Sequence, residues 1–179
     1  RSTPHQDPWQ YFTAEDMAAV GSFRQANCAQ CHSSTPGESK AGPNLADIQV
    51  LEERDALVAH FQKNRPESGL KDLQLRQLAN FMRKLDDENV VALSTAPAPI
   101  VGGAQLYMKN NCGVCHAVNG TGGKSGPPLN GVAKRRDRAW LEGHFVDPQK
   151  FSPGTMMPPY KFDQTEMGNI LAYMEALKD

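Results

Sequence analysis

Two copies of one five-residue motif divide the chain into similar halves. The letters C-A-Q-C-H at residues 28–32 return as C-G-V-C-H at residues 112–116, an offset of 84 residues. All four cysteines of the chain lie in these motifs, so none remains for a disulfide. The pattern C-x-x-C-H is the attachment site of a covalent haem, so the sequence predicts one haem in each half.

The spacing of the motif has a chemical reason. Two thiols about one helical turn apart can each form a thioether with one vinyl group of the same porphyrin, and the adjacent histidine is placed to bind its iron. The predicted thioether residues are Cys28, Cys31, Cys112 and Cys115, and the predicted iron ligands beside them are His32 and His116. A tetrahedral zinc site built from the four cysteines is the alternative, since paired C-x-x-C is also zinc spacing.

The similarity between the halves extends beyond the cysteines. At the same offset, Gly-Pro-x-Leu at 42–45 falls on 126–129, and the pair His60-Phe61 falls on His144-Phe145. After a gap of eight residues, the apolar positions of 78–85 superpose on those of 170–177, both with the i, i+3, i+4, i+7 spacing of an amphipathic helix. A zinc site built from the four cysteines would not require this agreement outside the motifs. The repeat and the helical spacing together predict a duplicated all-α fold.

Length and charge set further bounds. The 179 residues suffice for two small domains, and a half of about 80 residues has a marginal core without a staple or cofactor. The net charge of −1 shows no basic stripe for nucleic acid, and no apolar run is long enough for a membrane span. The chain opens at Arg1, so we interpret it as a mature or trimmed product, and an anchor ahead of it stays possible.

The expected domain boundaries follow from composition. Residues 1–12, rich in Pro and Gln, are predicted to form a tail, whose aromatic residues could cover apolar surface. Domain 1 is expected over 13–94, with Thr13 capping a helix that runs into the first motif. The Ala/Pro stretch 95–101 is predicted to be an extended linker, and domain 2, beginning with a helix at Gly102, is expected over 102–179.

Each half resembles a class I cytochrome c, and the pair resembles the dihaem members of that family. The shared order is an N-terminal helix running into C-x-x-C-H, a Gly-Pro-x-Leu turn, a middle helix, a loop bearing a methionine and a closing helix. The second half fits throughout. The first half lacks the methionine loop, for which it has only residues 65–69.

The resemblance implies further site residues. Met157, in Pro-Gly-Thr-Met-Met at 153–157, matches the family's distal iron ligand, and Met156 is its competitor. Pro43 and Pro127 match the proline that packs near the proximal histidine, although each could also be a plain turn proline.

The distal ligand of the first haem is left open by the sequence. His60 is the leading candidate, because it shares an apolar helix face with Leu57 and Phe61 and matches a position close to the family's distal ligand. Against it, His144 occupies the same place in the half that has Met157, so His60 could be a retained pocket histidine. The iron could then have no protein ligand on this side, or it could be bound by one of Met82, Lys71, Asn64 and His5.

The implied function is single-electron transfer between redox partners in a respiratory or related chain, without catalysis. If His60 binds iron, the first haem is expected at low potential and the second, with His/Met ligation, at high potential. The alternative is a small haem enzyme or ligand sensor with an open site at the first haem. We expect a periplasmic location, or the outer face of the cytoplasmic membrane, and docking to redox proteins. The basic cluster of Arg135, Arg136 and Arg138 is either a docking patch or a solvated helix start.

Overall fold

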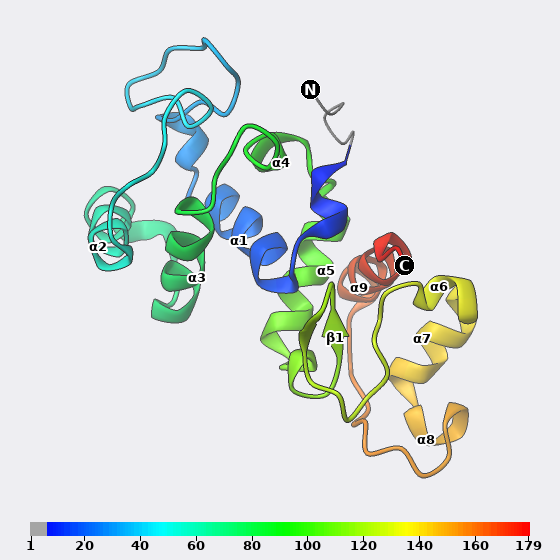
Figure 1. The fold of residues 1–179 in the computed structure, drawn as a ribbon. Coiled ribbons are helices and arrows are strands. Elements are labelled where there is room, and N and C mark those ends of the chain that lie inside the picture. The colour runs from blue at the N-terminus through cyan, green and yellow to red at the C-terminus, as the bar shows by residue number, and fades with distance from the viewer. Residues whose placement is uncertain (1–6) are drawn as a thin grey trace. The chain divides into compact units, whose positions relative to one another are not determined.

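The structure, a computed structural model, describes residues 7–179 as two helical units that divide between Pro97 and Ala98 (Figure 1). Unit 1 contains α1 (Ala14–Gln25), α2 (Arg54–Asn64), α3 (Asp72–Met82) and α4 (Ala92–Thr95), with short 3-10 turns η1 (Pro8–Tyr11), η2 (Cys28–Gln30) and η3 (Pro66–Ser68). Unit 2 contains α5 (Ala98–Lys109), α6 (Val132–Arg135), α7 (Arg138–Val146), α8 (Pro148–Phe151) and α9 (Gln164–Ala176), with the turn η4 (Cys112–Val114) and a hairpin of β1 (Ala117–Val118) and β2 (Thr121–Gly122). The all-α prediction is therefore confirmed.

Unit 1 is built on α3, which packs against both α1 and α2. Thr13 caps α1 as expected, since its hydroxyl accepts a hydrogen bond of 3.1 Å from the backbone N–H of Asp16. The apolar faces meet at Met17, Leu78 and Phe81, each 2% exposed or less. These contacts leave α2 at the edge of the core, where one of its faces borders a cavity.

The expected N-terminal tail is partly packed. Within the described residues, Pro8 is buried, and the ring of Phe12 meets Phe81 edge-on with 5.5 Å between centroids. Tyr11 by contrast remains 65% exposed. The ring of Phe12 therefore covers part of the apolar core of unit 1.

Unit 2 is built on the pair α5 and α9, which lie against each other in Figure 1. Gly103 makes this approach possible, because a Cβ there would lie 2.3 Å from the backbone oxygen of Asn169. Asp163 and Glu166 form a capping box that begins α9. The helices α6 and α7 and the loop that follows α8 line a second cavity beside this pair.

The stretch expected to be an unpacked linker is shorter and better packed than the sequence suggested. Thr95 ends α4 and α5 already begins at Ala98, four residues before the expected start at Gly102. Pro99 is tolerated in the first turn of α5, where its missing N–H would have no helical partner. Ala96 is 3% exposed, and its carbonyl accepts a hydrogen bond of 2.8 Å from Arg24.

Candidate functional site

Both C-x-x-C-H motifs begin with the same turn. Asn27 and Asn111, directly before the first cysteines, have positive φ angles of 52° and 55°, a conformation that asparagine tolerates better than most residues. The turn that follows is closed by a backbone hydrogen bond from the histidine to the first cysteine, 3.0 Å long in unit 1 and 2.9 Å long in unit 2. The duplicated letters therefore fold into duplicated local structure.

The histidine of each motif has one ring nitrogen fixed. His32 Nδ1 lies 2.9 Å from the carbonyl oxygen of Pro43, and His116 Nδ1 lies 2.8 Å from that of Pro127. A carbonyl can only accept, so Nδ1 carries the proton in both rings and Nε2 keeps its lone pair. This is the arrangement that metal-binding histidines use, and Nε2 is the atom left to bind iron.

A glycine makes room for each of these rings. A Cβ on Gly42 would lie 2.6 Å from Cε1 of His32, and a Cβ on Gly126 would lie 2.7 Å from Cε1 of His116. The Gly-Pro pair thus acts twice on the same histidine, because the glycine admits the ring and the proline carbonyl orients it.

Each motif lies at a cavity within its own unit. The cavity of unit 1 is about 520 Å³ and that of unit 2 about 790 Å³, and each is lined by both cysteines and the histidine of its motif. Both volumes lie in the usual range of about 300–1,000 Å³ for cofactor sites. Burial raises the pKa of Cys28 and of Cys112 to about 11, which marks these thiols as apolar-facing. Thiols, an oriented imidazole and a largely apolar cavity together fit a covalently held haem.

In unit 1, His60 lies across the cavity from His32. The centroids of the two imidazole rings are 6.0 Å apart. A metal ion bound to two imidazole nitrogens, each about 2 Å away, separates the ring centroids by roughly this distance. His60 comes from α2, and its side chain is solvent-exposed because the cavity is open on this side.

The remaining candidate ligands of the first haem are placed differently. Met82 lines the same cavity and is 6% exposed, packed in the closing helix as Met174 is in unit 2. Asn64 also lines the cavity, whereas Lys71 is the exposed N-cap residue of α3. His5 lies outside the described residues.

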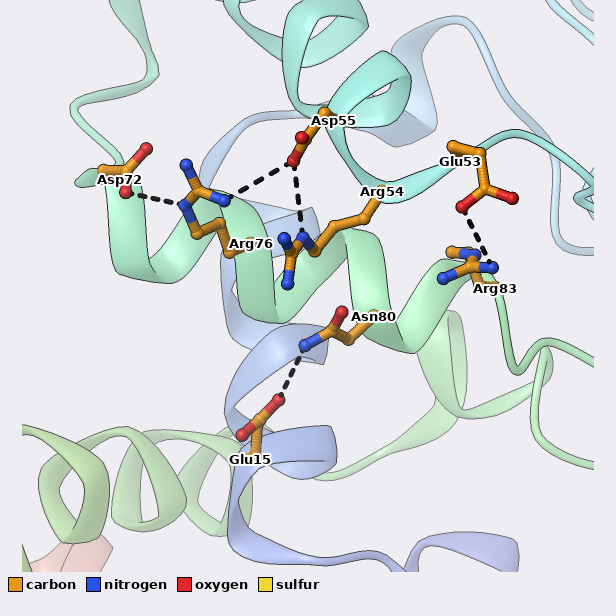
Figure 2. Close-up of polar contacts among 8 residues, drawn as sticks. All are labelled: Glu15, Glu53, Arg54, Asp55, Asp72, Arg76, Asn80 and Arg83. Atoms are coloured by element: carbon orange, nitrogen blue, oxygen red, sulfur yellow. Dashed lines mark hydrogen bonds and ion pairs between the residues drawn. The ribbon is translucent and has the colours of Figure 1, made fainter.

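Ion pairs and hydrogen bonds hold α2 and its neighbours on α3 (Figure 2). Arg76 on α3 joins Asp72 at 2.8 Å and Asp55 at the start of α2 at 3.4 Å. Arg83, just after α3, pairs with Glu53, the N-cap residue of α2, at 3.4 Å. Each exposed pair contributes little energy. Together, the pairs of Asp55 and Glu53 hold the N-terminal end of α2, the helix that carries His60, against α3.

In unit 2, the loop after α8 presents Met157 to the cavity. The backbone N–H of Met157 donates to the hydroxyl of Thr155 at 3.2 Å. The side chain of Gln149 stabilises the same turn by accepting from the N–H of Gly154 at 3.1 Å and donating to the carbonyl of Thr155. Met157 is half-buried whereas Met156 is 87% exposed, so the geometry favours Met157 of the two.

His144 has the same place in unit 2 as His60 has in unit 1, but its surroundings differ. Its ring stacks on Trp140 with 4.6 Å between centroids and an interplanar angle of 12°. Its Nδ1 is buried without a hydrogen-bond partner. Burial, and to a lesser extent the nearby His116 and Arg136, lower the pKa of His144.

Arg65 is a pocket residue that the sequence reasoning missed. It follows α2 directly, where the methionine loop is absent, and its guanidinium donates to the side chain of Gln30 at 2.7 Å and to the carbonyl of Asn27 at 3.2 Å. The same group lies 3.8 Å from Sγ of Cys31. The one sequence signal for Arg65 is its position in residues 65–69, which stand where the second half has the methionine loop.

The basic cluster of unit 2 contacts its own unit. Arg135 and Arg136 line the cavity, which the sequence did not suggest. The contacts are Arg135 to the carbonyls of Pro128 and Asn130, Arg136 over the ring of Trp140 at 4.7 Å, and Arg138 to Glu175 at 2.8 Å. All three side chains nevertheless remain exposed, as a solvated helix start predicts.

Residues 7–179 lack two further features. No group of three or more His, Cys, Asp or Glu side chains is arranged to hold a metal ion there. No helix in that range is long and apolar enough to cross a membrane.

The chain is similar to parts of known proteins, among them two subunits of cytochrome c oxidases. Cytochrome c oxidase subunit 2 of Alkalihalophilus pseudofirmus is 34% identical over 85 residues, covering 42% of this chain and 25% of that protein. The Cbb3-type cytochrome c oxidase subunit FixP of Rhizobium meliloti is 27% identical over 142 residues, covering 71% of this chain and 46% of that protein. The chain thus spans less than half the length of either relative. No solved structure matches it significantly.

The match to a family model is more extensive. The model described as Cytochrome c matches twice, over residues 17–95 and 100–178, and each match contains one C-x-x-C-H motif and its cavity. The prediction of two covalently bound haem c groups is thereby confirmed, and the zinc alternative is set aside. The chain belongs to the cytochrome c family, as a tandem of two such domains.

Proposed function

We propose that this protein carries single electrons between redox partners, with the haem of unit 1 at low potential and the haem of unit 2 at high potential. A haem with both axial positions filled exchanges one electron at a time without binding substrate. The two haem domains are proposed over 13–94 and 102–179, with the second extended to Ala98 where α5 begins.

The observation that carries this proposal is the pair of facing imidazoles in unit 1. His32, with Nδ1 held by a carbonyl, directs Nε2 to iron, and His60 lies opposite with its ring centroid 6.0 Å away. The shortened connection after α2 leaves no methionine loop to compete. We therefore assign His60 as the second axial ligand in unit 1.

In unit 2 the proposed ligands are His116 and Met157. Both methionines line the cavity, but Met157 is half-buried on a hydrogen-bonded turn whereas Met156 is 87% exposed, which supports Met157 as the ligand. A thioether sulfur favours reduced iron relative to a second imidazole, so axial ligands alone can separate haem potentials within a range of about 0.8 V. Electrons would then move energetically downhill from unit 1 to unit 2.

The first test is spectroscopic. Electron paramagnetic resonance and near-infrared magnetic circular dichroism of the oxidised protein should show one bis-imidazole haem and one His/Met haem. His60→Ala should abolish only the bis-imidazole signal. His144→Ala, at the matching position of unit 2, is the control and should leave both signals in place. If His60→Ala retained both signals, the assignment of His60 as an iron ligand would be wrong.

A redox titration tests the asymmetry itself. Two one-electron steps at separate potentials are expected, with the lower step lost or raised in His60→Ala. Two equal high potentials would contradict the proposal. A rapid spectral change of the reduced wild-type protein under carbon monoxide would instead support an open iron in unit 1 and the alternative role in catalysis or ligand sensing.

For the partner, we propose a respiratory oxidase complex. Both relatives are named as subunits of cytochrome c oxidases, which supports this class of partner and a location on the periplasmic or outer face of the cytoplasmic membrane. The reduced protein should then be reoxidised by oxidase-containing membranes at a rate that falls as salt screens the encounter. Reoxidation no faster than that without membranes would argue against it.

A further inference from the structure

The two matching pocket histidines differ in what lies beside Nδ1. In unit 1, the amide nitrogen of Asn64 lies 3.3 Å from Nδ1 of His60 and donates to the carbonyl oxygen of the same residue at 2.8 Å. In unit 2, the position 84 residues later is Pro148, which has no polar side chain. Accordingly, Nδ1 of His144 is buried without a partner.

The placement of Asn64 follows from the helix. Asn64 is the last residue of α2 and lies four residues after His60, so the two side chains share one face. Both line the cavity of unit 1. The amide can serve either ring state, because one end donates a hydrogen bond and the other accepts one.

An imidazole that binds a metal through Nε2 carries its proton on Nδ1, and that proton needs an acceptor. Histidine ligands nearly always have such a partner, which orients the ring and makes it more basic. In unit 1, the carbonyl of Pro43 fills this role for His32, whereas the group beside Nδ1 of His60 is the side chain of Asn64. Asn64 is therefore the neighbour within reach.

We propose that Asn64 is the positioning residue of the His60 ligand, an inference that rests on the proposed ligation by His60. If Nε2 of His60 held iron, the amide of Asn64 would turn its oxygen toward Nδ1–H and accept that hydrogen bond, giving up its own donation to the carbonyl of His60. This contact holds the imidazole ring toward the cavity and raises its basicity, which favours oxidised iron. The replacement of asparagine by proline at 148 leaves His144 without this support and unit 2 dependent on Met157.

Two substitutions at position 64 separate positioning from a purely structural role. Loss of such a partner typically weakens a metal–ligand bond about 10–100-fold. If Asn64→Ala weakens oxidised-state ligation tenfold relative to the reduced state, the potential of the first haem rises by about 59 mV. Asn64→Asp supplies a stronger acceptor and should lower the same potential. If Asn64 only stabilised the end of α2, both variants would change the stability of the protein, but they would not shift the potential of the first haem in opposite directions.

The experiment is a redox titration with electron paramagnetic resonance on the wild-type protein, Asn64→Ala, Asn64→Asp and Gln62→Ala. Gln62 is the matched control, an exposed amide on the same helix, and its variant should behave as wild type. The second haem should be unchanged throughout. Unchanged potential and signal of the first haem in both Asn64 variants would overturn the role of Asn64 while leaving His60 ligation intact. Absence of a bis-imidazole signal in the wild-type protein would overturn both proposals.

Discussion

At the scale of single residues, the glycine of each Gly-Pro pair is the position least open to change. A Cβ on Gly126 would meet the His116 ring at 2.7 Å, while a Cβ on Gly168, within α9, would meet nothing within 4 Å. We predict that Gly126→Ala destabilises the protein by about 1–3 kcal/mol, since added volume must displace the ring. Denaturant unfolding measures the loss of stability, and the absorbance of the second haem reports the displacement of the His116 ring.

Gly168→Ala is the matched control for this prediction. An alanine in an open helical position should stabilise the protein by about 0.5–1 kcal/mol. An equal effect of the two variants on stability, or an unaltered haem spectrum in Gly126→Ala, would argue against steric placement of the histidine.

The paired methionines give a second prediction at this scale. Met157→Leu should remove the sulfur ligand with little change in volume, so the His/Met spectral signature of the oxidised protein should be lost and the second haem should become high-spin or bind an external ligand. Met156→Leu should leave the spectrum unchanged, because that side chain is 87% exposed. The reverse outcome would assign Met156 as the ligand.

Some residue roles were readable from spacing and others were not. The motif and the Gly-Pro pair are local patterns, so the cysteines, His32 and His116 and the prolines beside them could be named in advance. Arg65 and Asn64 matter through contacts that form only when α2 lies beside the first motif or closes the cavity. Their roles depend on distances that no sequence pattern states.

At the scale of elements, the short helix α4 depends on one side chain from α1. Arg24 donates to the carbonyls of Ala92, Leu93 and Ala96 at 3.3, 3.0 and 2.8 Å. Helix ends need such partners, and four residues cannot form a stable helix alone. Burial of this guanidinium lowers the pKa of Arg24, but the group remains charged at neutral pH.

We predict that Arg24→Met destabilises unit 1 by about 2–3 kcal/mol, because charged hydrogen bonds to buried carbonyls are lost. Hydrogen exchange at the backbone amides of α4 should accelerate strongly. Arg54→Met, which loses only an exposed pair with Asp55 at 3.4 Å, should change stability by less than about 0.5 kcal/mol. Similar exchange rates for α4 in both variants would contradict the role of Arg24.

Element boundaries were predicted where a local signal exists. Thr13 caps α1 as expected, whereas the composition of the Ala/Pro stretch predicts a linker and α5 in fact starts at Ala98. Proline in a first helical turn looks the same in sequence as proline in a linker. What decides between them is the packing of α5 on α9, which lies far along the chain.

At the scale of the whole molecule, alkaline pH should act unequally on the two units. Unit 2 contains Tyr107, Tyr160 and Tyr173, three of the four tyrosines. Burial raises the pKa of all three, that of Tyr107 to about 12. A raised phenol pKa means that the folded state holds its proton longer than the unfolded chain. Stability is therefore fully present below pH 10 and falls as the pH rises toward 12.

We predict that unit 2 loses about 1–3 kcal/mol for each of the two buried tyrosines, Tyr107 and Tyr173, over this pH range, before unit 1 responds. Hydrogen exchange or denaturant unfolding followed separately in each unit is the measurement. Tyr107→Phe loses the hydrogen bond to the carbonyl of His116, 2.7 Å long, and should cost about 0.5–1.5 kcal/mol at neutral pH but flatten the alkaline decline. An equal decline in both units would contradict this prediction.

The sequence by itself determined the duplication, the helical class, the cofactor and the residues that hold it from one side. These follow from thiol and imidazole chemistry within five adjacent residues and from apolar periodicity, which are local properties of a chain. The tertiary structure decided which side chains meet around each cavity. Whether His60 reaches the cavity, how deeply Met157 and Met156 are buried, and which histidine has a partner for Nδ1 all depend on how separate helices and loops close around the cavity. Such contacts join residues distant in sequence, so only packing sets them.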